Sequence, residues 1–275
     1  MHIGIVGLGL MGGSLALDLK SYNLASRIVG YDRNQKHRQE ALELGLVDEI
    51  VDFEDLKKCD VIFLAIPVEG IISALQNLQD IEPKTTIIDL GSTKEKIVAS
   101  CPQKIRSNFV AAHPMAGTEY SGPMAAFRGL YYDKIVVLCN TEENDAFHKE
   151  RAENIFVTIG MQIVYMDAKE HDLHAAYISH LPHAISYALA NSVLKQEDPK
   201  SILILAAGGF KDMSRLAKSS PTMWSDIFKQ NKKNLLASLE VFKKELRTAK
   251  ELIEKERWEE LKEWMQKATT LHQIL

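Results

Sequence analysis

The sequence predicts an α/β protein in two parts, a mostly parallel sheet covered by helices and then an all-helical part. Short β-branched runs alternate with stretches of helical spacing up to about residue 166, which is typical of a parallel sheet with helices on both faces. After Met166 the strand-like runs stop. Because 275 residues exceed what one hydrophobic core usually organises, we expect two domains, 1–166 and 167–275.

In the first part the strand-like segments are short and mostly apolar. They are 2–6, 27–31, 61–66, 85–89, 108–112, 135–138 and 162–165. Apolar residues at helical spacing occupy segments between them, namely 11–20, 34–44, 71–78, 94–100 and 145–159. This alternation favours parallel strands joined by helical crossovers.

The second part reads as helices. Asp167 is a plausible N-cap for a helix to about Leu194, which Pro182 should kink because proline lacks a backbone donor. Further helices are expected over 200–207 and from Thr222 onward. The last of these carries an apolar stripe whose members are three or four residues apart: Leu235, Leu239, Phe242, Leu246, Ala249 and Ile253. Such a stripe needs a partner helix.

Composition narrows the class of protein. An apolar fraction of 46% and a charged fraction of 25% are typical of a globular fold. The net charge of −4 is too mild to predict a nucleic-acid or anionic-membrane surface, so we expect a small-molecule partner. The three cysteines show no zinc or disulfide spacing, there is no export signal, and no apolar run approaches the roughly 20 residues of a membrane span. We therefore expect a cytoplasmic protein that does not enter a membrane.

A glycine-rich motif follows the first strand-like segment and opens the first helix. Its residues are Gly7, Leu8, Gly9, Leu10, Met11 and Gly12. Gly7 would allow the tight turn, Gly9 would leave room for a pyrophosphate, and Gly12 would let helix and strand pack closely. Asp32 ends the second strand 20 residues beyond Gly12, where a carboxylate would accept from ribose hydroxyls. This context predicts a Rossmann-type site for NAD rather than NADP, although the Arg33 guanidinium could pair with a 2′-phosphate.

Two side chains follow predicted strands and could perform chemistry at the same edge. Ser92 follows segment 85–89, so it should face the nicotinamide end of the cofactor, or else cap the helix starting near Lys94. His113 follows segment 108–112 and precedes the rigid Pro114. A neutral imidazole there could accept a hydroxyl proton, and the alternative is a histidine that satisfies local backbone groups.

The helical part adds two further candidates. Four histidines lie in its first helix, at positions 171, 174, 180 and 183, but His171 and His180 are about half a turn out of phase, so we expect no metal site. Arg215 offers a planar fork suited to a carboxylate, and its alternative partner is the nearby Asp212.

Together these segments resemble the prephenate dehydrogenase family, which includes arogenate-using relatives. The segments are 7–14, 91–94, 113–119, 180–183 and 208–215, and the resemblance spans nearly the whole chain. It implies oxidative decarboxylation of prephenate to 4-hydroxyphenylpyruvate with hydride transfer to NAD+, a step in tyrosine biosynthesis. Two alternatives stay open, an arogenate dehydrogenase with the same motifs and a catalytically silent NAD-binding sensor dimer.

The resemblance also implies roles for individual residues. His113 matches the catalytic histidine that bonds the 4-hydroxyl, and Ser92 matches the serine that orients that hydroxyl and the nicotinamide. Arg215 matches the arginine that pairs with a substrate carboxylate, and His183 matches a residue near the side-chain end. Five positions align with residues lining or gating the site: Thr118, Glu119, Gly208, Asp212 and Trp224. A homodimer through the C-terminal helices is implied as well.

Overall fold

The computed structural model describes residues 1–274. The chain divides into two compact units, the first from Met1 to Asn231 and the second from Lys232 onward. The boundary expected at residue 166 coincides with the end of the last strand, inside the first unit. As a division between domains it stays a prediction.

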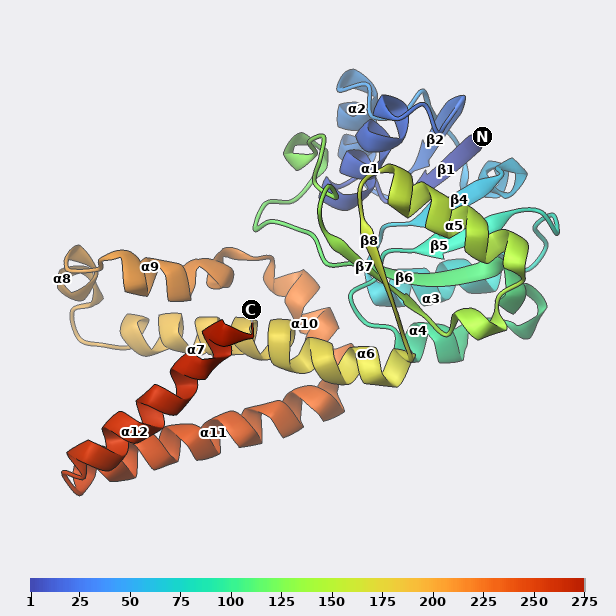
Figure 1. Cartoon of the computed structure of the whole chain (residues 1–275). Helices are drawn as coiled ribbons and strands as arrows, with labels where there is room; N and C mark the ends of the chain where they lie inside the picture. The colour runs from blue at the N-terminus through green and yellow to red at the C-terminus, as the bar shows by residue number, and fades with distance from the viewer. Residues whose placement is uncertain (275) are drawn as a thin grey trace. The chain divides into compact units, whose positions relative to one another are not determined.

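Within the described residues, eight strands form one sheet in the order β3-β2-β1-β4-β5-β6-β7-β8 (Figure 1). Their bounds are His2–Val6 (β1), Arg27–Tyr31 (β2), Glu49–Ile50 (β3), Val61–Leu64 (β4), Thr86–Asp89 (β5), Phe109–Pro114 (β6), Ile135–Cys139 (β7) and Gln162–Met166 (β8). All neighbouring strands are parallel except β6 and β7. The predicted mostly parallel sheet is confirmed, and the two-residue β3 was not predicted.

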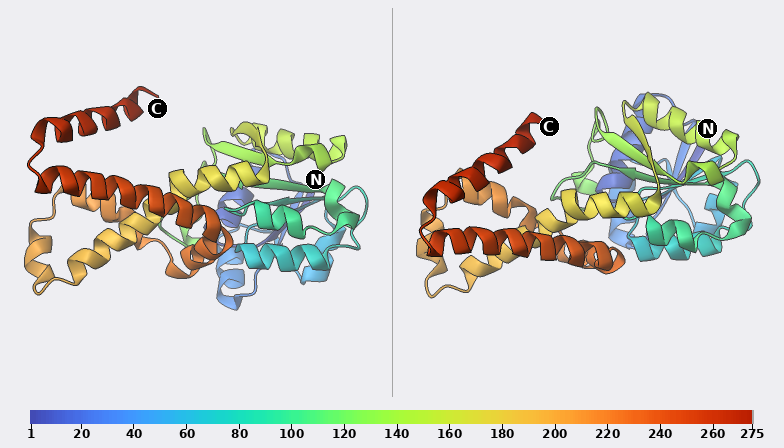
Figure 2. Two further views of the ribbon diagram at one scale, coloured as in Figure 1. Left: turned by 90° about the horizontal axis from the view of Figure 1, so that it is seen from below. Right: turned by 60° about the horizontal axis from the view of Figure 1, so that its bottom comes forward.

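Helices cover both faces of this sheet (Figure 2). They are α1 (Leu10–Ser21), α2 (Gln35–Glu43), α3 (Val68–Asn77), α4 (Glu95–Ser100) and α5 (Ala146–Thr158). One apolar core includes Leu15 of α1 and Phe156 of α5, and the other includes Leu75 of α3 and Ile97 of α4. Because both faces are covered, β4 and β5 are buried throughout, which explains the continuous apolar sequence of β4.

The helix expected from Asp167 is present, with an interruption. The Asp167 carboxylate accepts from the amides of Lys169 and Glu170, which confirms the predicted N-cap of α6 (Ala168–Ala175). A π-helical turn over Ala176–His180 then leads into α7 (Leu181–Leu194). Pro182 lies in the first turn of α7, where its missing N–H and its ring would break regular helix geometry, and the wider π turn accommodates it.

The remaining helices differ from the prediction. In the first unit they are α8 (Pro199–Ile204), α9 (Gly208–Ser214) and α10 (Pro221–Gln230), of which α9 was not predicted. The single helix expected from Thr222 onward is wrong, because α10 ends at Gln230 and two further helices follow.

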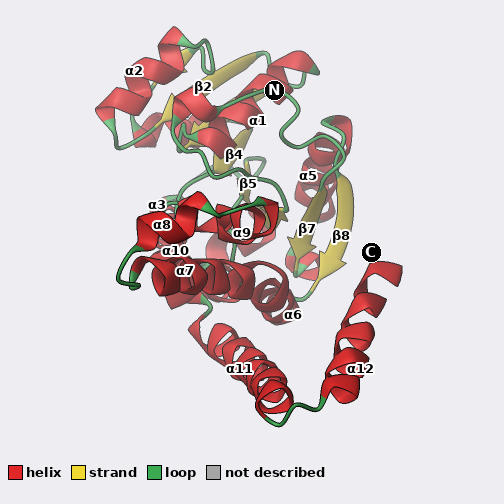
Figure 3. Cartoon of the chain, turned by 90° about the vertical axis from the view of Figure 1, so that its left-hand side faces the viewer, coloured by secondary structure: helices red, strands yellow, loops and turns green. Residues whose placement is uncertain are grey.

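The second unit contains α11 (Lys232–Glu254) and α12 (Trp258–Thr269), joined by a short turn (Figure 3). Along the apolar stripe of α11, Leu235 is buried, whereas Leu246 and Ile253 are 55% and 51% exposed. Within residues 1–274, part of the stripe is therefore not covered by another helix. Among the described residues no helix is both long and apolar enough to cross a membrane.

Candidate active site

The glycine-rich turn between β1 and α1 has the geometry that its sequence predicts. Gly7 has φ +93°, and a Cβ there would lie 2.3 Å from the carbonyl oxygen of Ala65. A Cβ at Gly12 would lie 1.9 Å from the carbonyl oxygen of Gly7, so both positions require glycine. At Gly9 the nearest atom to a Cβ would be 3.9 Å away, which leaves open space over the first turn of α1. That space and the free amides of the helix N-terminus fit a pyrophosphate group.

The carboxylate of Asp32 faces this turn. Its Oδ2 accepts from the amide of Leu8 at 2.9 Å, and its Oδ1 accepts from the amide of Asn34 at 2.8 Å. His37 lies beside it, with Nδ1 3.5 Å from Oδ2, and Arg33 is exposed. Of the motif's apolar members, Leu8 and Leu10 have buried side chains and Met11 is partly buried, so chiefly backbone groups remain available to a ligand.

His113 lies at the end of β6 and is linked to two residues of α6. Its Nδ1 is 2.8 Å from Nε2 of His171, and His171 Nδ1 is 2.8 Å from Oδ1 of Asp172. An ionised carboxylate only accepts, so His171 donates from Nδ1 and accepts at Nε2 from the Nδ1–H of His113. This hydrogen-bonding pattern leaves Nε2 of His113 as an acceptor. We call His113, His171 and Asp172 the histidine relay.

Burial lowers the pKa of His113 well below its usual value, and the neighbouring His171, Lys94 and His180 lower it further. The ring is therefore neutral at physiological pH, as a base must be before it accepts a proton. The predicted base thus has the required protonation state. From the sequence, His171 was a candidate only for a metal site, and Asp172 was not a candidate at all. Their contact with His113 could not be predicted, because 58 residues separate His113 from His171.

Ser92 lies on the loop after β5 and is partly exposed at the carboxyl edge of the sheet. It does not cap α4. The first turn of α4 is instead capped by Asp172, whose Oδ1 accepts from the amide of Lys94 at 2.7 Å and whose Oδ2 accepts from the amide of Glu95 at 3.0 Å. The capping role considered for Ser92 is therefore not observed, and its role toward a ligand stays a prediction.

The structure brings together two predicted substrate residues, His183 and Trp224. Their rings stack with centroids 3.4 Å apart at an interplanar angle of 20°. His183 Nδ1 donates to the carbonyl of Ser179, which leaves its Nε2 as an acceptor, and burial lowers its pKa. Trp224 is buried, and its Nε1 has no hydrogen-bond partner in the part of the chain that the structure describes.

A second predicted pair is formed by Arg215 and Glu119. Arg215 Nη1 lies 3.9 Å from Glu119 Oε2, so the partner of the guanidinium is Glu119 and not the alternative Asp212. Glu119 also lines a hollow of about 530 Å³ with Tyr120, Ser121, Met124 and Ala125. Thr118 Oγ1 accepts from the amide of Tyr120 in the same loop. The two charged groups come from the β6–β7 loop and from the turn after α9.

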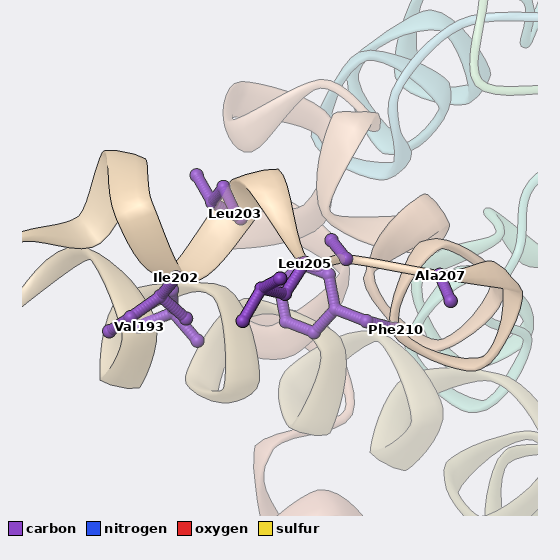
Figure 4. A pocket seen from close by; sticks show the side chains of 7 residues that line it. Val193, Ile202, Leu203, Leu205, Ala207 and Phe210 are labelled. Carbon is purple, nitrogen blue, oxygen red and sulfur yellow. The ribbon is translucent and has the colours of Figure 1, made fainter.

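Gly208 and Asp212 lie exposed on α9. Within residues 1–274, no hydrogen bond or ion pair links them to the histidine relay. A separate pocket of about 200 Å³ lies along α7–α9, and its lining is entirely apolar (Figure 4): Val193, Ile202, Leu203, Leu205, Ala206, Ala207 and Phe210. It holds none of the groups that could perform chemistry. The described residues also contain no cluster of three or more side chains suited to a metal ion.

Comparison with known proteins agrees with this arrangement. The family model for the nucleotide-binding domain of prephenate dehydrogenase matches residues 15–165, and the model for its dimerization domain matches residues 167–267. The chain belongs to the prephenate dehydrogenase family. The resemblance drawn from the motifs is thereby confirmed, and the chain is an oxidoreductase of the prephenate dehydrogenase type.

Relatives support the same family. A prephenate dehydrogenase of Bacillus subtilis is 34% identical over 94% of this chain and 71% of its own length. The structure of prephenate dehydrogenase from A. aeolicus in complex with hydroxyphenyl propionate and NAD+ superposes with a TM-score of 0.92 and 34% identity, covering 99% of this chain and 97% of the other. Arogenate dehydrogenase of Synechocystis superposes with a TM-score of 0.82 and 31% identity, covering 99% of both chains.

Proposed function

We propose that the chain catalyses the oxidative decarboxylation of prephenate to 4-hydroxyphenylpyruvate with NAD+, as a step in tyrosine biosynthesis. The observation that carries this proposal is the histidine relay. It fixes a buried, neutral His113 with Nε2 ready to accept, at the end of a strand whose carboxyl edge also carries the glycine-rich turn and Ser92.

The residues around the turn fit NAD. Gly7 and Gly12 permit the tight approach of strand and helix, and Gly9 leaves space for a pyrophosphate. The Asp32 carboxylate, which lies beside this turn, would accept from the adenosine ribose hydroxyls. We propose NAD+ as the cofactor, as in the A. aeolicus relative. When bound, NAD+ supplies the acceptor for the hydride that leaves the carbon bearing the 4-hydroxyl.

His113 acts on the hydroxyl of that carbon. Its Nε2 accepts a hydrogen bond from the hydroxyl and takes up the positive charge that develops on the proton, while Ser92 orients the hydroxyl. The imidazolium that begins to form is stabilised through His171 by the Asp172 carboxylate. As the bond to the ring carboxylate breaks, its electron pair enters the ring, CO2 leaves, and aromatisation makes the reaction effectively irreversible.

Prephenate is a dianion, and the chain offers groups for its carboxylates and side chain. We propose that Arg215 pairs with one substrate carboxylate, because its guanidinium is 55% exposed and held only at 3.9 Å by Glu119. We propose that His183, stacked on Trp224, lies at the side-chain end of the substrate, as the family resemblance implies. Thr118, Gly208 and Asp212 are proposed to line or gate the same site on the strength of the family resemblance.

A second candidate substrate is arogenate, which carries an amino group in place of the side-chain ketone. The observation that favours it is Glu119, because a carboxylate beside Arg215 could accept from an ammonium group. The Synechocystis relative is an arogenate dehydrogenase. Prephenate remains the first proposal, because the Bacillus subtilis and A. aeolicus relatives are prephenate dehydrogenases.

We also propose a homodimer formed through the C-terminal helices, because residues 167–267 match a dimerization domain. Ile204, the last residue of α8, is 81% exposed, and Leu205, which follows it and lines the apolar pocket, is 83% exposed. A second copy of the chain would cover such a surface. The division into a nucleotide domain (1–166) and a helical domain (167–275) belongs to the same proposal.

The free cysteines, Cys59, Cys101 and Cys139, are compatible with a reducing cytoplasm.

The test is a comparison of initial rates with prephenate and with arogenate, each with NAD+ and with NADP+, followed at the NADH absorbance. We expect the highest kcat/KM for prephenate with NAD+. A higher value for arogenate would favour the second candidate. If no pair of substrates gave turnover while calorimetry showed NAD binding, the chain would be the silent sensor.

A further inference from the structure

The segment after β5 buries a complete ion pair, Asp89 and Lys94. Neither side chain has any exposed area. The ammonium group of Lys94 contacts Oδ2 of Asp89 and donates to the carbonyl oxygen of Ala112 at 2.7 Å. Oδ1 of Asp89 accepts from the amide of Ala112 at 3.1 Å, and Oδ2 accepts from the amide of Gly91 at 3.0 Å. Apolar side chains often stabilise a fold as well as such a pair, so the pair calls for another explanation.

The two side chains bind the residue directly before His113. Strand β5 ends at Asp89, whose partner in the ladder is Ala111, whereas β6 continues to Pro114. On this side Ala112 therefore has no strand residue opposite it. Its amide is bound by Asp89 and its carbonyl by Lys94. The ion pair extends the ladder by one residue and fixes the backbone that carries the His113 ring.

Lys94 also contacts the histidine relay through its main chain. Its backbone amide donates to Oδ1 of Asp172, the same atom that accepts from His171. His171 in turn accepts from His113. Both the backbone of His113 and the orientation of its ring thus depend on contacts of this single lysine.

The charged and titratable groups that face His113 come from three elements. His171 and Asp172 belong to α6, His180 belongs to the π-helical turn, and Asp89 and Lys94 belong to the end of β5 and the segment after it. The Lys94 ammonium disfavours a second positive charge nearby and so contributes to the lowered pKa of His113. Removing the ammonium should raise that pKa.

We propose that Lys94 is a positioning residue for the reaction, holding the β6 backbone at Ala112 with its ammonium and Asp172 with its amide so that Nε2 of His113 points at the substrate hydroxyl. The inference rests on the proposed function of His113 as the base. Because Lys94 is buried, we assign its side chain no contact with the substrate.

The test removes both charges together, because Lys94→Met alone would leave a buried, unpaired carboxylate. In Asp89→Asn/Lys94→Met the amide oxygen at position 89 can still accept from Ala112. We expect kcat with prephenate to fall about 100-fold, as a misplaced catalytic group predicts. KM for NAD+ should stay within about twofold, because the glycine-rich turn is untouched. The acid limb of the kcat/KM profile should move to higher pH.

The matched control is Arg106→Met. Arg106 is buried and holds the other end of β6, donating to the carbonyl oxygens of Phe109 and Asn140 at 2.8 and 2.9 Å. This variant should lose stability but keep the parent kcat and pH profile. If the double variant does not fold, Asp89→Asn/Lys94→Gln keeps hydrogen-bonding groups but also lacks the ammonium, so its acid limb must move upward too.

The inference would be overturned if a folded variant without the Asp89 and Lys94 charges kept the acid limb of its kcat/KM profile at the pH of the parent. It would also be overturned if that variant lost no more kcat than Arg106→Met does. Failure of the proposed function looks different. In that case His113→Asn would turn over normally, whatever the Lys94 variants do.

Discussion

Nε2 of His171 lies 2.8 Å from Nδ1 of His113. This contact joins α6, the first helix after the sheet, to the second-last residue of β6. Because Asp172 fixes the tautomer of His171, the contact also fixes the tautomer of His113. A helix that follows the nucleotide domain in sequence therefore determines which nitrogen of the proposed base faces the substrate.

Loss of the acceptor at position 171 should impair the chemical step. In His171→Leu the Nδ1–H of His113 has no partner, so the wrong tautomer becomes populated. We expect kcat to fall about 10- to 100-fold with little change in KM, measured by initial rates of NADH formation. His174→Leu, at an exposed position of the same helix, is the control and should match the parent. Equal activity of the two variants would exclude the relay.

The proposed role of Arg215 predicts a change in KM. Arg215→Ala removes the guanidinium from a site where a charge-assisted hydrogen bond contributes about 1.5–3 kcal/mol, so KM for prephenate should rise at least about tenfold. kcat should change much less. Lys218→Ala, an exposed cation of the same short turn, should leave KM unchanged. A comparable rise in KM in the Lys218 variant would point to net charge rather than to specific pairing.

Asp32 should control the choice of cofactor. Asp32→Asn keeps an acceptor for the Leu8 amide but removes the charge that repels a 2′-phosphate, and Arg33 and His37 remain beside it. We expect the ratio of kcat/KM for NADP+ to that for NAD+ to rise about tenfold, or ~1.4 kcal/mol. Asp55→Asn, an exposed carboxylate paired with Lys58, serves as the control. An unchanged ratio in Asp32→Asn would show that the carboxylate does not select the cofactor.

His148 predicts how stability depends on pH. It is buried, its Nε2 donates to the carbonyl of Pro83, and its Nδ1 accepts from the hydroxyl of Thr86. Burial lowers its pKa, so below its unfolded pKa near 6.5 the unfolded chain binds more protons than the folded chain. The free energy of unfolding should therefore fall as pH falls below about 6.5.

His148→Gln keeps a donor and an acceptor but cannot be protonated in this range. Urea titrations at several pH values should show a shallower pH dependence for this variant than for the parent. An equally steep dependence would assign the effect to other buried histidines, such as His180, whose pKa burial lowers to about 4.

The features that the sequence predicts well are local. The turn at Gly7 and Gly12 and the N-cap at Asp167 depend on a few neighbouring residues, and the structure shows them as expected. A central strand such as β4 is also recognisable, because both its faces are buried and apolar.

The features that were missed depend on contacts between distant segments. Nothing in the spacing of His171 and Asp172 indicates that they meet His113 and the first turn of α4, because the meeting requires α6 to pack on the sheet edge. Helix α9 was missed since it begins at Gly208 and Gly209, residues of low helix propensity. The strand β3 has only two residues and is held by pairing with β2.

The proposal that His113 is the base of a prephenate dehydrogenase is tested most directly by the initial rate of NADH formation from prephenate and NAD+, measured for the parent and for His113→Asn. We expect rapid turnover by the parent and a kcat lower by about 10²- to 10⁴-fold in the variant, with NAD+ binding retained. Normal turnover by His113→Asn would contradict it.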